Sequence, residues 1–280
     1  MRHIISLTAV PPRFAMLGPA LASLVAQKQR AESIRLYIPL TYRRFAGYAG
    51  EVPAVPDGVT IVRVADDLGP ATKVLYAARD LRGQAVDIVY GDDDHHYLPD
   101  WTQRLLAARA AHPDCAVAAC GTSVALLGRP DYAPKPQPQA VKPPSMRHQL
   151  GFQVKRLLMG IPHGGRAHLP MNPPFRCIKE SGFADVAEGF AGVAISPDFL
   201  DDAVFDIPPH LAMVDDIWLS GHLARRGIGI WAEAGANRFC TLRAASSTDA
   251  LHLQRAEGTQ RLEANRACID HMRREYGVWC

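Results

Sequence analysis

Short apolar runs alternate with amphipathic stretches along the first 120 residues of the chain. The apolar runs, rich in β-branched side chains, predict strands at residues 4–10, 33–38, 59–64, 86–90 and 116–119. Apolar residues that recur every three or four positions predict helices at residues 15–29, 72–81 and 101–111. Because strands alternate with helices, the pattern predicts an α/β fold: a Rossmann-like, mostly parallel sheet flanked by helices.

The second half of the chain has a different pattern. Six prolines fall within residues 129–147, a density that no regular element survives, so this segment is predicted to be a mobile loop, either a passive linker or a substrate-gating loop. Beyond it we predict a glycine-flanked strand at 189–197, a helix at 215–227, a strand at 228–231 and a charged helix at about 259–276. The chain is therefore expected to form one large domain, 1–280, with irregular insertions in its second half.

Composition narrows the class of protein. A hydrophobic content of 48% and a charged content of 21% fit a soluble globular protein, and a net charge of +3 without a basic tract gives no indication of nucleic-acid binding. The six cysteines lack CxxC or zinc-finger spacing, which favours reduced thiols in a cytoplasmic protein. No signal peptide opens the sequence, and no apolar run approaches the roughly 20 residues of a membrane span, so none is expected.

Three consecutive carboxylates, Asp92, Asp93 and Asp94, follow the fourth predicted strand. In parallel sheets, ligands bind outside the carboxyl ends of the strands. Alternation along an extended segment would point Asp92 and Asp94 the same way and Asp93 the other. Converging carboxylates favour a cation between them, and Mg²⁺ or Mn²⁺ held by one or two carboxylates is usually completed by water and phosphates. The alternative is a solvated acidic turn.

Histidines also follow the carboxylates. His95 and His96 lack metalloenzyme spacing such as HExxH and are interpreted as turn residues. His163 and His168 lie in a segment rich in glycine and proline, where they could contact a substrate.

An ordered set of motifs resembles a known family. The motifs are Ser6-Leu-Thr-Ala-Val-Pro-Pro-Arg13, Leu68-Gly-Pro-Ala-Thr-Lys73, Tyr90-Gly-Asp-Asp-Asp94, Glu188-Gly-Phe-Ala-Gly-Val193 and Asp215-Asp-Ile-Trp-Leu-Ser220. Together they cover roughly residues 3–231 and resemble the glycosyltransferases of the GT-A fold, which use nucleoside-diphosphate sugars and carry an Asp-x-Asp motif. The resemblance implies a nucleotide-sugar-binding half at 1–128 and an acceptor-side half at 148–280.

The resemblance also implies the donor site. Asp94, with help from Asp92 or Asp93, would hold Mg²⁺ or Mn²⁺ on the diphosphate of a UDP- or GDP-sugar. His252 is the nearest candidate for the C-terminal metal-binding histidine of such folds. The residues expected around the nucleotide are Thr8, Arg13, Asp67, Lys73, Asp92 and Asp93.

On the acceptor side, the pair Asp215 and Asp216 matches the acidic motif that supplies the base in inverting members. The base would deprotonate a saccharide or other hydroxyl acceptor, and we assign it to Asp216. Asp215 could instead be a helix N-cap, and a helix N-terminus is expected to lower a carboxylate's pKa. Glu188, before a glycine-rich turn, could border the acceptor or lie on the surface.

Three other functions fit the sequence less well. A sugar-nucleotide nucleotidylyltransferase would usually have a glycine-rich loop after the first strand, and residues 6–13 contain no glycine. A haloacid dehalogenase-type phosphatase would carry its Asp-x-Asp after the first strand rather than the fourth. A non-catalytic nucleotide- or partner-binding domain would be expected to have lost the acidic residues, which are intact here.

Overall fold

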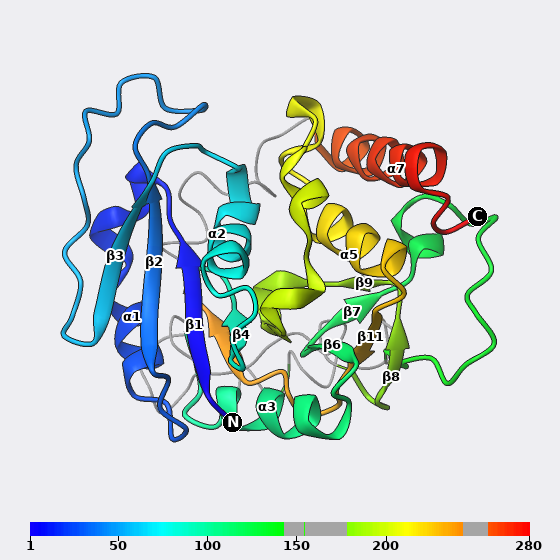
Figure 1. Ribbon diagram of the computed structural model, residues 1–280, viewed down its shortest axis with the longest axis horizontal. Coiled ribbons are helices and arrows are strands. Elements are labelled where there is room, and N and C mark those ends of the chain that lie inside the picture. Colours follow the sequence, from blue (N-terminus) through cyan, green and yellow to red (C-terminus); the bar gives the residue numbers. More distant parts are fainter. Residues whose placement is uncertain (143–153, 155–177, 243–256) are drawn as a thin grey trace.

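The computed structural model describes residues 1–142, 154, 178–242 and 257–280 (Figure 1). An eight-stranded sheet runs through its centre in the order β3-β2-β1-β4-β10-β6-β11-β8. The strands of this sheet are β1 (His3–Thr8), β2 (Ser33–Pro39), β3 (Val59–Val64), β4 (Asp87–Tyr90), β6 (Cys115–Ala118), β8 (Gly182–Ala184), β10 (Val193–Ile195) and β11 (Gly229–Ala232). Two small ladders join β5 (His95–Tyr97) to β12 (Phe239–Thr241), and β7 (Gly121–Thr122) to β9 (Val186–Ala187).

The sheet is mostly parallel. Strands β3, β2, β1 and β4 pair in parallel, and so do β6 and β11. Strand β10 runs antiparallel between β4 and β6, and β8 lies antiparallel at the edge next to β11. The predicted fold class, a mostly parallel sheet flanked by helices, is confirmed.

Helices cover both faces of the sheet. Helices α1 (Gly18–Val25) and α3 (Trp101–Ala111) pack on one face, while α2 (Thr72–Asp80), α5 (Asp215–Arg225) and α7 (Glu257–Tyr276) pack on the other (Figure 1). Side chains along β4 alternate between these two cores: Ile88 and Tyr90 face α2 and α5, and Val89 faces α1 and α3. The continuous apolar runs in the sequence therefore reflect burial of both strand faces.

Several predicted boundaries were wrong for identifiable reasons. The helix expected at 15–29 is a 3-10 helix, Pro11–Met16, followed by the shorter α1, because Pro19 is tolerated only in a first helical turn. The strand expected at 189–197 is confined to β10, since a 3-10 helix, Gly189–Ala191, precedes it. His95 and His96, interpreted as turn residues, instead form strand β5.

The described part of the proline-rich segment is extended. It runs beside residues 180–183, with isolated bridges from Gln139 to Phe183 and from Val141 to Glu180. No strand longer than a single bridge forms within 129–142, as the proline density predicts. The remaining residues of the segment, 143–147, lie outside the described residues, as do His163 and His168.

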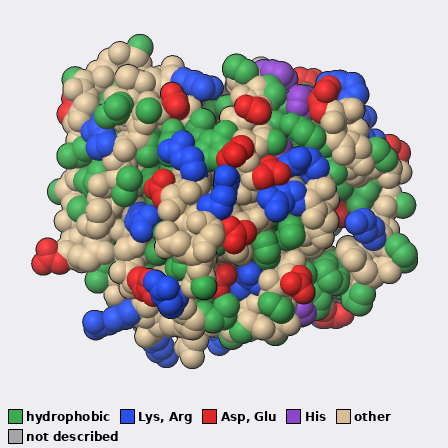
Figure 2. Space-filling view, in the orientation of Figure 1, with side chains coloured by type: hydrophobic (Ala, Val, Ile, Leu, Met, Phe, Trp, Pro, Cys, Tyr) green, Lys and Arg blue, Asp and Glu red, His purple; other side chains and the backbone are tan. Residues whose placement is uncertain are grey.

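Charged side chains are mixed over the surface, except for a few buried pairs. On the face drawn in Figure 2, basic and acidic side chains are interspersed, in line with the nearly balanced charge of the sequence.

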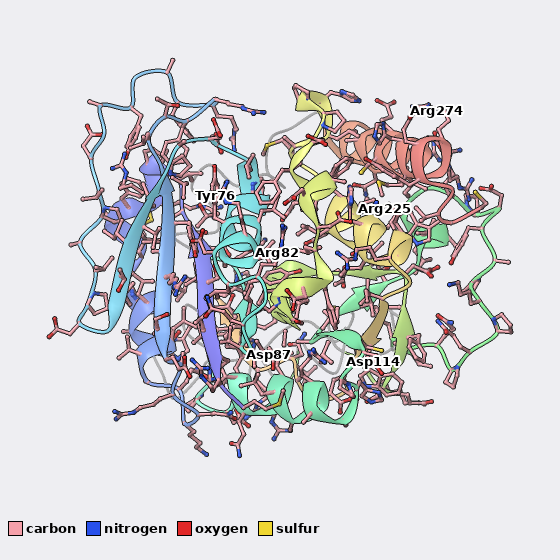
Figure 3. The ribbon with its side chains drawn as sticks, in the orientation of Figure 1. Tyr76, Arg82, Asp87, Asp114, Arg225 and Arg274 are labelled. Carbon is pink, nitrogen blue, oxygen red and sulfur yellow. The ribbon has the colours of Figure 1, made fainter. Side chains whose placement is uncertain are left out.

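One buried ion pair joins a helix to the sheet. Asp87, the first residue of β4 (Figure 3), is buried and lies 3.3 Å from Arg109 of α3. This pair fixes α3 to the amino end of the sheet, opposite the carboxyl ends. Among the described residues, no helix combines the length and apolar character that crossing a membrane requires.

The stability of the turn that precedes β10 should be sensitive to an added methyl group at Gly192. Gly192 has φ +111°, and a Cβ there would lie 2.4 Å from Trp101 Nε1, whose N–H donates to the Ala191 carbonyl at 2.9 Å. Gly192→Ala should therefore lower the free energy of unfolding by about 1–3 kcal/mol, measured by urea denaturation. Gly18→Ala is the matched control, since its Cβ would meet no heavy atom within 4 Å, and it should be neutral or stabilising. Equal stability of the two variants would contradict this account of the turn.

Candidate functional site

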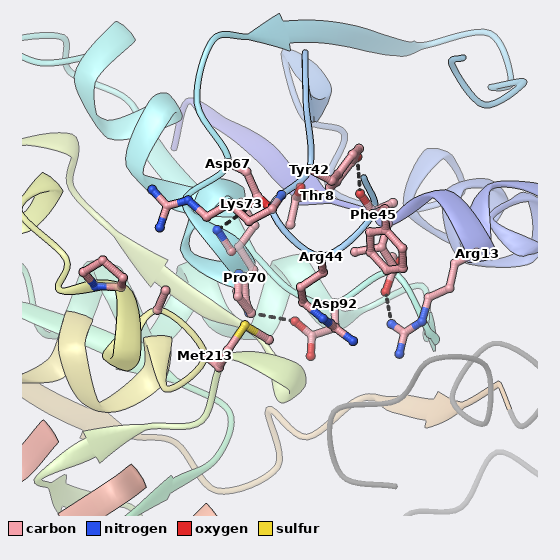
Figure 4. Close-up of a pocket in the computed structure, with 17 residues that line it drawn as sticks. Thr8, Arg13, Tyr42, Arg44, Phe45, Asp67, Pro70, Lys73, Asp92 and Met213 are labelled. Carbon is pink, nitrogen blue, oxygen red and sulfur yellow. Dashed lines mark hydrogen bonds and ion pairs between the residues drawn. The ribbon is translucent and has the colours of Figure 1, made fainter. Parts of the chain in front are cut away.

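A cavity of about 290 Å³ opens at the carboxyl ends of β1 to β4 (Figure 4). Each of these strands is followed by a loop that contributes to its wall, as expected for a parallel sheet. All six residues predicted to surround a nucleotide line it: Thr8, Arg13, Asp67, Lys73, Asp92 and Asp93. These six side chains therefore meet at one edge of the sheet, and their role around a nucleotide stays a prediction.

The first loop places Arg13 against the carboxylates. Strand β1 ends at Thr8, and Pro11 starts the 3-10 helix that carries Arg13 back toward the end of β4. Arg13 Nη1 lies 2.6 Å from Asp93 Oδ1 and 3.8 Å from Asp94 Oδ2. The three side chains are almost fully buried, so the guanidinium compensates two neighbouring negative charges.

The three consecutive aspartates form a turn rather than an extended segment. Asp93 and Asp94 occupy the turn itself, and the Tyr97 hydroxyl accepts the Asp92 N–H at 2.7 Å. The expected alternation of side chains is therefore wrong. Asp93 and Asp94 both lie near the Arg13 guanidinium, whereas Asp92 Oδ1 lies 2.7 Å from Lys73 Nζ. Asp94 lies behind the cavity wall instead of lining it.

The environment separates the acidities of Asp93 and Asp94. Burial, with the neighbouring Asp94 and Asp92 charges, raises the pKa of Asp93 to about 7 against the opposing effect of Arg13. Burial also disfavours ionised Asp94, but the adjacent His95 and Arg13 outweigh it and lower the pKa of Asp94. Asp94 is therefore the more firmly ionised of the two.

Buried polar atoms without a regular hydrogen bond gather at this turn. They are Asp93 Oδ2, Asp94 Oδ1 and His95 Nδ1, of which the last two lie 2.5 Å apart as an ion pair. A buried carboxylate oxygen without a donor, such as Asp93 Oδ2, is costly, and a bound cation satisfies it. Within the described ranges, no three His, Cys, Asp or Glu side chains converge as a metal cluster, and His252 lies outside those ranges. The turn therefore fits Mg²⁺ or Mn²⁺ only in the mode that uses few protein ligands and completes the shell with phosphates and water.

Lys73 lies at the centre of a buried ion cluster. Its side chain is on α2, the residue is only 4% exposed, and its ammonium Nζ lies 2.7 Å from Asp92 Oδ1 and 3.1 Å from Asp215 Oδ2. Burial opposes its charge, but the carboxylates of Asp215, Asp92 and Asp216 raise the pKa of Lys73 well above its ordinary value. Lys73 is therefore a permanent cation that joins the end of β4 to the start of α5.

The acidic pair at the start of α5 does not have the expected capping role. The N-cap position belongs to Val214, without a side-chain capping hydrogen bond, and Asp215 is the first helical residue. Asp215 instead pairs with Lys73, so the N-cap alternative for this residue was wrong. The expected acidifying effect of the helix terminus is also overcome at Asp216. Burial, followed by the charge of Asp215, raises the pKa of Asp216 to about 8.

A glycine turn before β10 holds Asp216 in place. The Gly189 N–H donates to Asp216 Oδ1 at 2.9 Å. A Cβ at Gly189 would lie 2.8 Å from that oxygen and 3.1 Å from Lys73 Nζ, so only glycine allows both side chains to approach. The glycine-rich motif seen in the sequence therefore serves this close approach.

Glu188, predicted to border an acceptor, lies next to this turn. Its Oε2 atom is 2.7 Å from Lys142 Nζ and 2.7 Å from Cys120 Sγ, and the side chain is about three-quarters buried. Glu188 is therefore not a freely solvated surface residue. It precedes Gly189 in the second half of the chain, and no contact of Glu188 with the cavity is observed among the described residues, so its place beside an acceptor stays a prediction.

Sequence reasoning missed part of the cavity wall. The loop after β2 contributes Tyr42, Arg43, Arg44 and Phe45, and the segment before α5 contributes Pro209, Ala212 and Met213. The signal for the first group was present in two adjacent arginines flanked by aromatic residues directly after a predicted strand. Asp67 organises this loop, since its carboxylate accepts the N–H groups of Arg43 at 2.9 Å and Gly69 at 2.8 Å.

Comparison with known proteins gives only distant likenesses. No protein-family model and no curated protein sequence matches the chain. The chain is similar to solved structures of S. aureus TarS. The crystal structure of TarS residues 1–349 gives a TM-score of 0.45 and 12% identity, and the match covers 99% of this chain and 74% of that one. The same TarS fragment in complex with UDP gives a TM-score of 0.42, 11% identity and coverage of 85% of this chain. The chain spans 60% of the length of that UDP complex, and a likeness this low leaves the site to be argued from its own residues.

Removing the central cation should destabilise the fold in a pH-dependent way. Lys73→Met leaves Asp92 and Asp215 without their partner, which should lower the free energy of unfolding by about 3–5 kcal/mol at pH 8. The loss should be smaller at pH 5, because the abandoned carboxylates can take up protons. Lys179→Met is the matched control: this lysine is 61% exposed, lies 3.1 Å from Glu180 and should contribute less than about 1 kcal/mol. Urea unfolding at both pH values measures the difference, and a loss independent of pH would rule out unpaired carboxylates as its cause.

Proposed function

We propose that the protein is a metal-dependent glycosyltransferase of the GT-A type, which moves a sugar from a nucleoside-diphosphate sugar to an acceptor hydroxyl with inversion. One observation carries this proposal: the residues expected around the nucleotide line a single cavity, and the expected base, Asp216, lies close enough to Lys73 in its wall to raise the pKa of that lysine. The expected donor-binding groups and the expected base thus meet at one ion cluster.

The donor would occupy the cavity at the carboxyl ends of the strands. Its diphosphate carries negative charge toward Arg13 and toward the Asp92–Asp94 turn, where Mg²⁺ or Mn²⁺ would be held by Asp94 with help from Asp92 or Asp93. When bound, the ion acts as a Lewis acid that stabilises the charge on the departing diphosphate. The base and sugar of the donor would be selected by the walls formed by the loop after β2 and the segment before α5.

On the acceptor side, the chemistry is a single displacement. The acceptor hydroxyl oxygen forms a bond to the anomeric carbon while the bond from that carbon to the diphosphate oxygen breaks, and Asp216 takes the hydroxyl proton. A carboxylate whose pKa is raised to about 8 is a stronger base than a solvated one, provided that it is ionised. The Gly189 N–H orients this carboxylate, and Glu188 beside it would contact the acceptor.

Nucleotide titration separates this function from its alternatives. Calorimetry with UDP and with GDP, each with and without Mn²⁺, should show metal-dependent binding of one of them by a glycosyltransferase. Asp94→Ala should abolish that dependence while the fold persists. A screen of sugar nucleotides should then show metal-dependent hydrolysis without acceptor. A partner-binding domain would bind neither nucleotide, and a nucleotidylyltransferase would release pyrophosphate from a nucleoside triphosphate and a sugar phosphate.

Asp216→Asn should abolish transfer and spare donor binding. Loss of the base should lower turnover by roughly 10²–10⁴-fold. Donor affinity should change little, because Asp216 does not line the cavity. Turnover of the unmodified protein should rise with pH, with a midpoint near pH 8, because Asp216 must lose its proton before it can accept another. The variant should lack this rise.

Asp215→Asn is the comparison variant for this prediction. Asp215 pairs with Lys73, so its loss should mainly lower the thermal midpoint and have a smaller effect on turnover. If Asp215→Asn is inactive and Asp216→Asn is active, the two roles are exchanged. If both remain active, the base is another residue.

A further inference from the structure

Arg43 brings a positive charge to the wall of the cavity at the carboxyl ends of the strands. It belongs to the loop that follows β2, and it is exposed. Within the described residues, the Arg43 guanidinium makes no hydrogen bond or ion pair, whereas Arg13 and Lys73 in the same wall are both paired with carboxylates of the acidic turn. Arg43 can therefore bind a ligand without breaking an existing contact.

Asp67 brings a negative charge to the same part of the wall. Its Oδ2 atom accepts the Arg43 N–H at 2.9 Å, and its Oδ1 atom accepts the Gly69 N–H at 2.8 Å. A carboxylate can accept about four hydrogen bonds, so these two backbone donors leave capacity for a ligand. Since the Asp67 carboxylate and the Arg43 guanidinium form no ion pair with each other among the described residues, both are available to the cavity that they line.

The distance of this pair from the acidic turn suits the base of a nucleotide. Only β1 separates β2 from β4, and neighbouring strands lie about 4.8 Å apart, so the loop after β2 begins roughly 10 Å from the turn. A ribose and a phosphate bridge such a distance. The loops that carry Arg43 and Asp67 also contribute Phe45 and Pro70 to the wall (Figure 4), which are apolar surfaces on which a planar ring can pack.

We propose that Arg43 and Asp67 read the base of the donor and select uracil or guanine over cytosine and adenine. This inference rests on the proposed function, because it concerns the nucleotide of that same cavity. Uracil and guanine both present a carbonyl oxygen beside a ring N–H, which matches a guanidinium donor and a carboxylate acceptor. Cytosine and adenine present an amino group beside an unprotonated ring nitrogen, so they oppose donor to donor and acceptor to acceptor.

The selection follows from the cost of leaving charged groups without partners. A mismatched base would displace water from the guanidinium and the carboxylate and would give neither of them a hydrogen bond. A well-placed arginine–base contact discriminates between bases by roughly 5–150-fold in affinity. An Arg43 that bound the diphosphate instead would strengthen the binding of every nucleotide equally, since the phosphates are common to all of them.

Calorimetry with UDP, GDP, CDP and ADP, each with and without Mn²⁺, tests the base preference. The unmodified protein should bind UDP or GDP at least about 5-fold more tightly than CDP and ADP. Arg43→Met keeps the length of the side chain but removes its donors, so it should lose most of this preference while urea unfolding stays unchanged. Arg30→Met is the matched control: Arg30 is also exposed, carries the same charge and lies outside the cavity wall, so the preference should remain.

The results separate base recognition from phosphate binding and from the proposed function. Equal affinity for the four nucleotides in the unmodified protein, or an unchanged preference in Arg43→Met, would overturn the inference. Equal weakening of all four in Arg43→Met would assign Arg43 to the phosphates and would also overturn it.

The metal and the sugar nucleotides complete the separation. A base preference that depends on Arg43, without metal dependence or hydrolysis of sugar nucleotides, would support the base site and contradict the glycosyltransferase. Metal-dependent binding and hydrolysis without a base preference would do the reverse. Absence of binding by all four nucleotides would contradict both.

Discussion

The ion pairs of the buried Lys73 ammonium are the interaction on which the cavity edge of the sheet depends. This ammonium compensates Asp92 at the end of β4 and Asp215 at the start of α5, two segments more than 100 positions apart in the sequence. Charges removed from water are tolerated only when they are paired, so loss of Lys73 would leave the buried Asp215 and the partly buried Asp92 without their shared cation. The α2 helix, the acidic turn and the start of α5 are thereby held in one arrangement.

Negative charge exceeds positive charge in this region. Five carboxyl groups, those of Asp92, Asp93, Asp94, Asp215 and Asp216, share two buried cations, Arg13 and Lys73. The raised pKa values of Asp93 and Asp216 are the local response to this excess, because retaining a proton costs less free energy than burying another unpaired charge. A divalent cation would relieve the excess at the turn and leave Asp216, farther away, as the group with an exchangeable proton.

Sequence reasoning succeeded where the signal was local and long enough. The runs that became β3 and α3 were predicted to the residue, and the six residues that the family resemblance implies line one cavity. It failed for strands of two or three residues, such as β5, because so short a run has no readable period. It also failed where tertiary contacts decide the local conformation: Tyr97 turns the backbone at Asp92, and Lys73 takes Asp215 away from a capping role.

The reversed direction of β10 determines what kind of group reaches the functional edge. The strands on either side of it, β4 and β6, arrive there with their carboxyl ends, and β4 is followed by the acidic turn. Because β10 runs the other way between β4 and β6, its amino-terminal turn reaches the same edge and contributes the Gly189 N–H. One inverted strand thus brings the backbone that precedes it, and not the backbone that follows it, to this edge, and the carboxylate held by its amide is Asp216. In a sheet of uniform polarity, the turn before this strand would lie at the opposite edge.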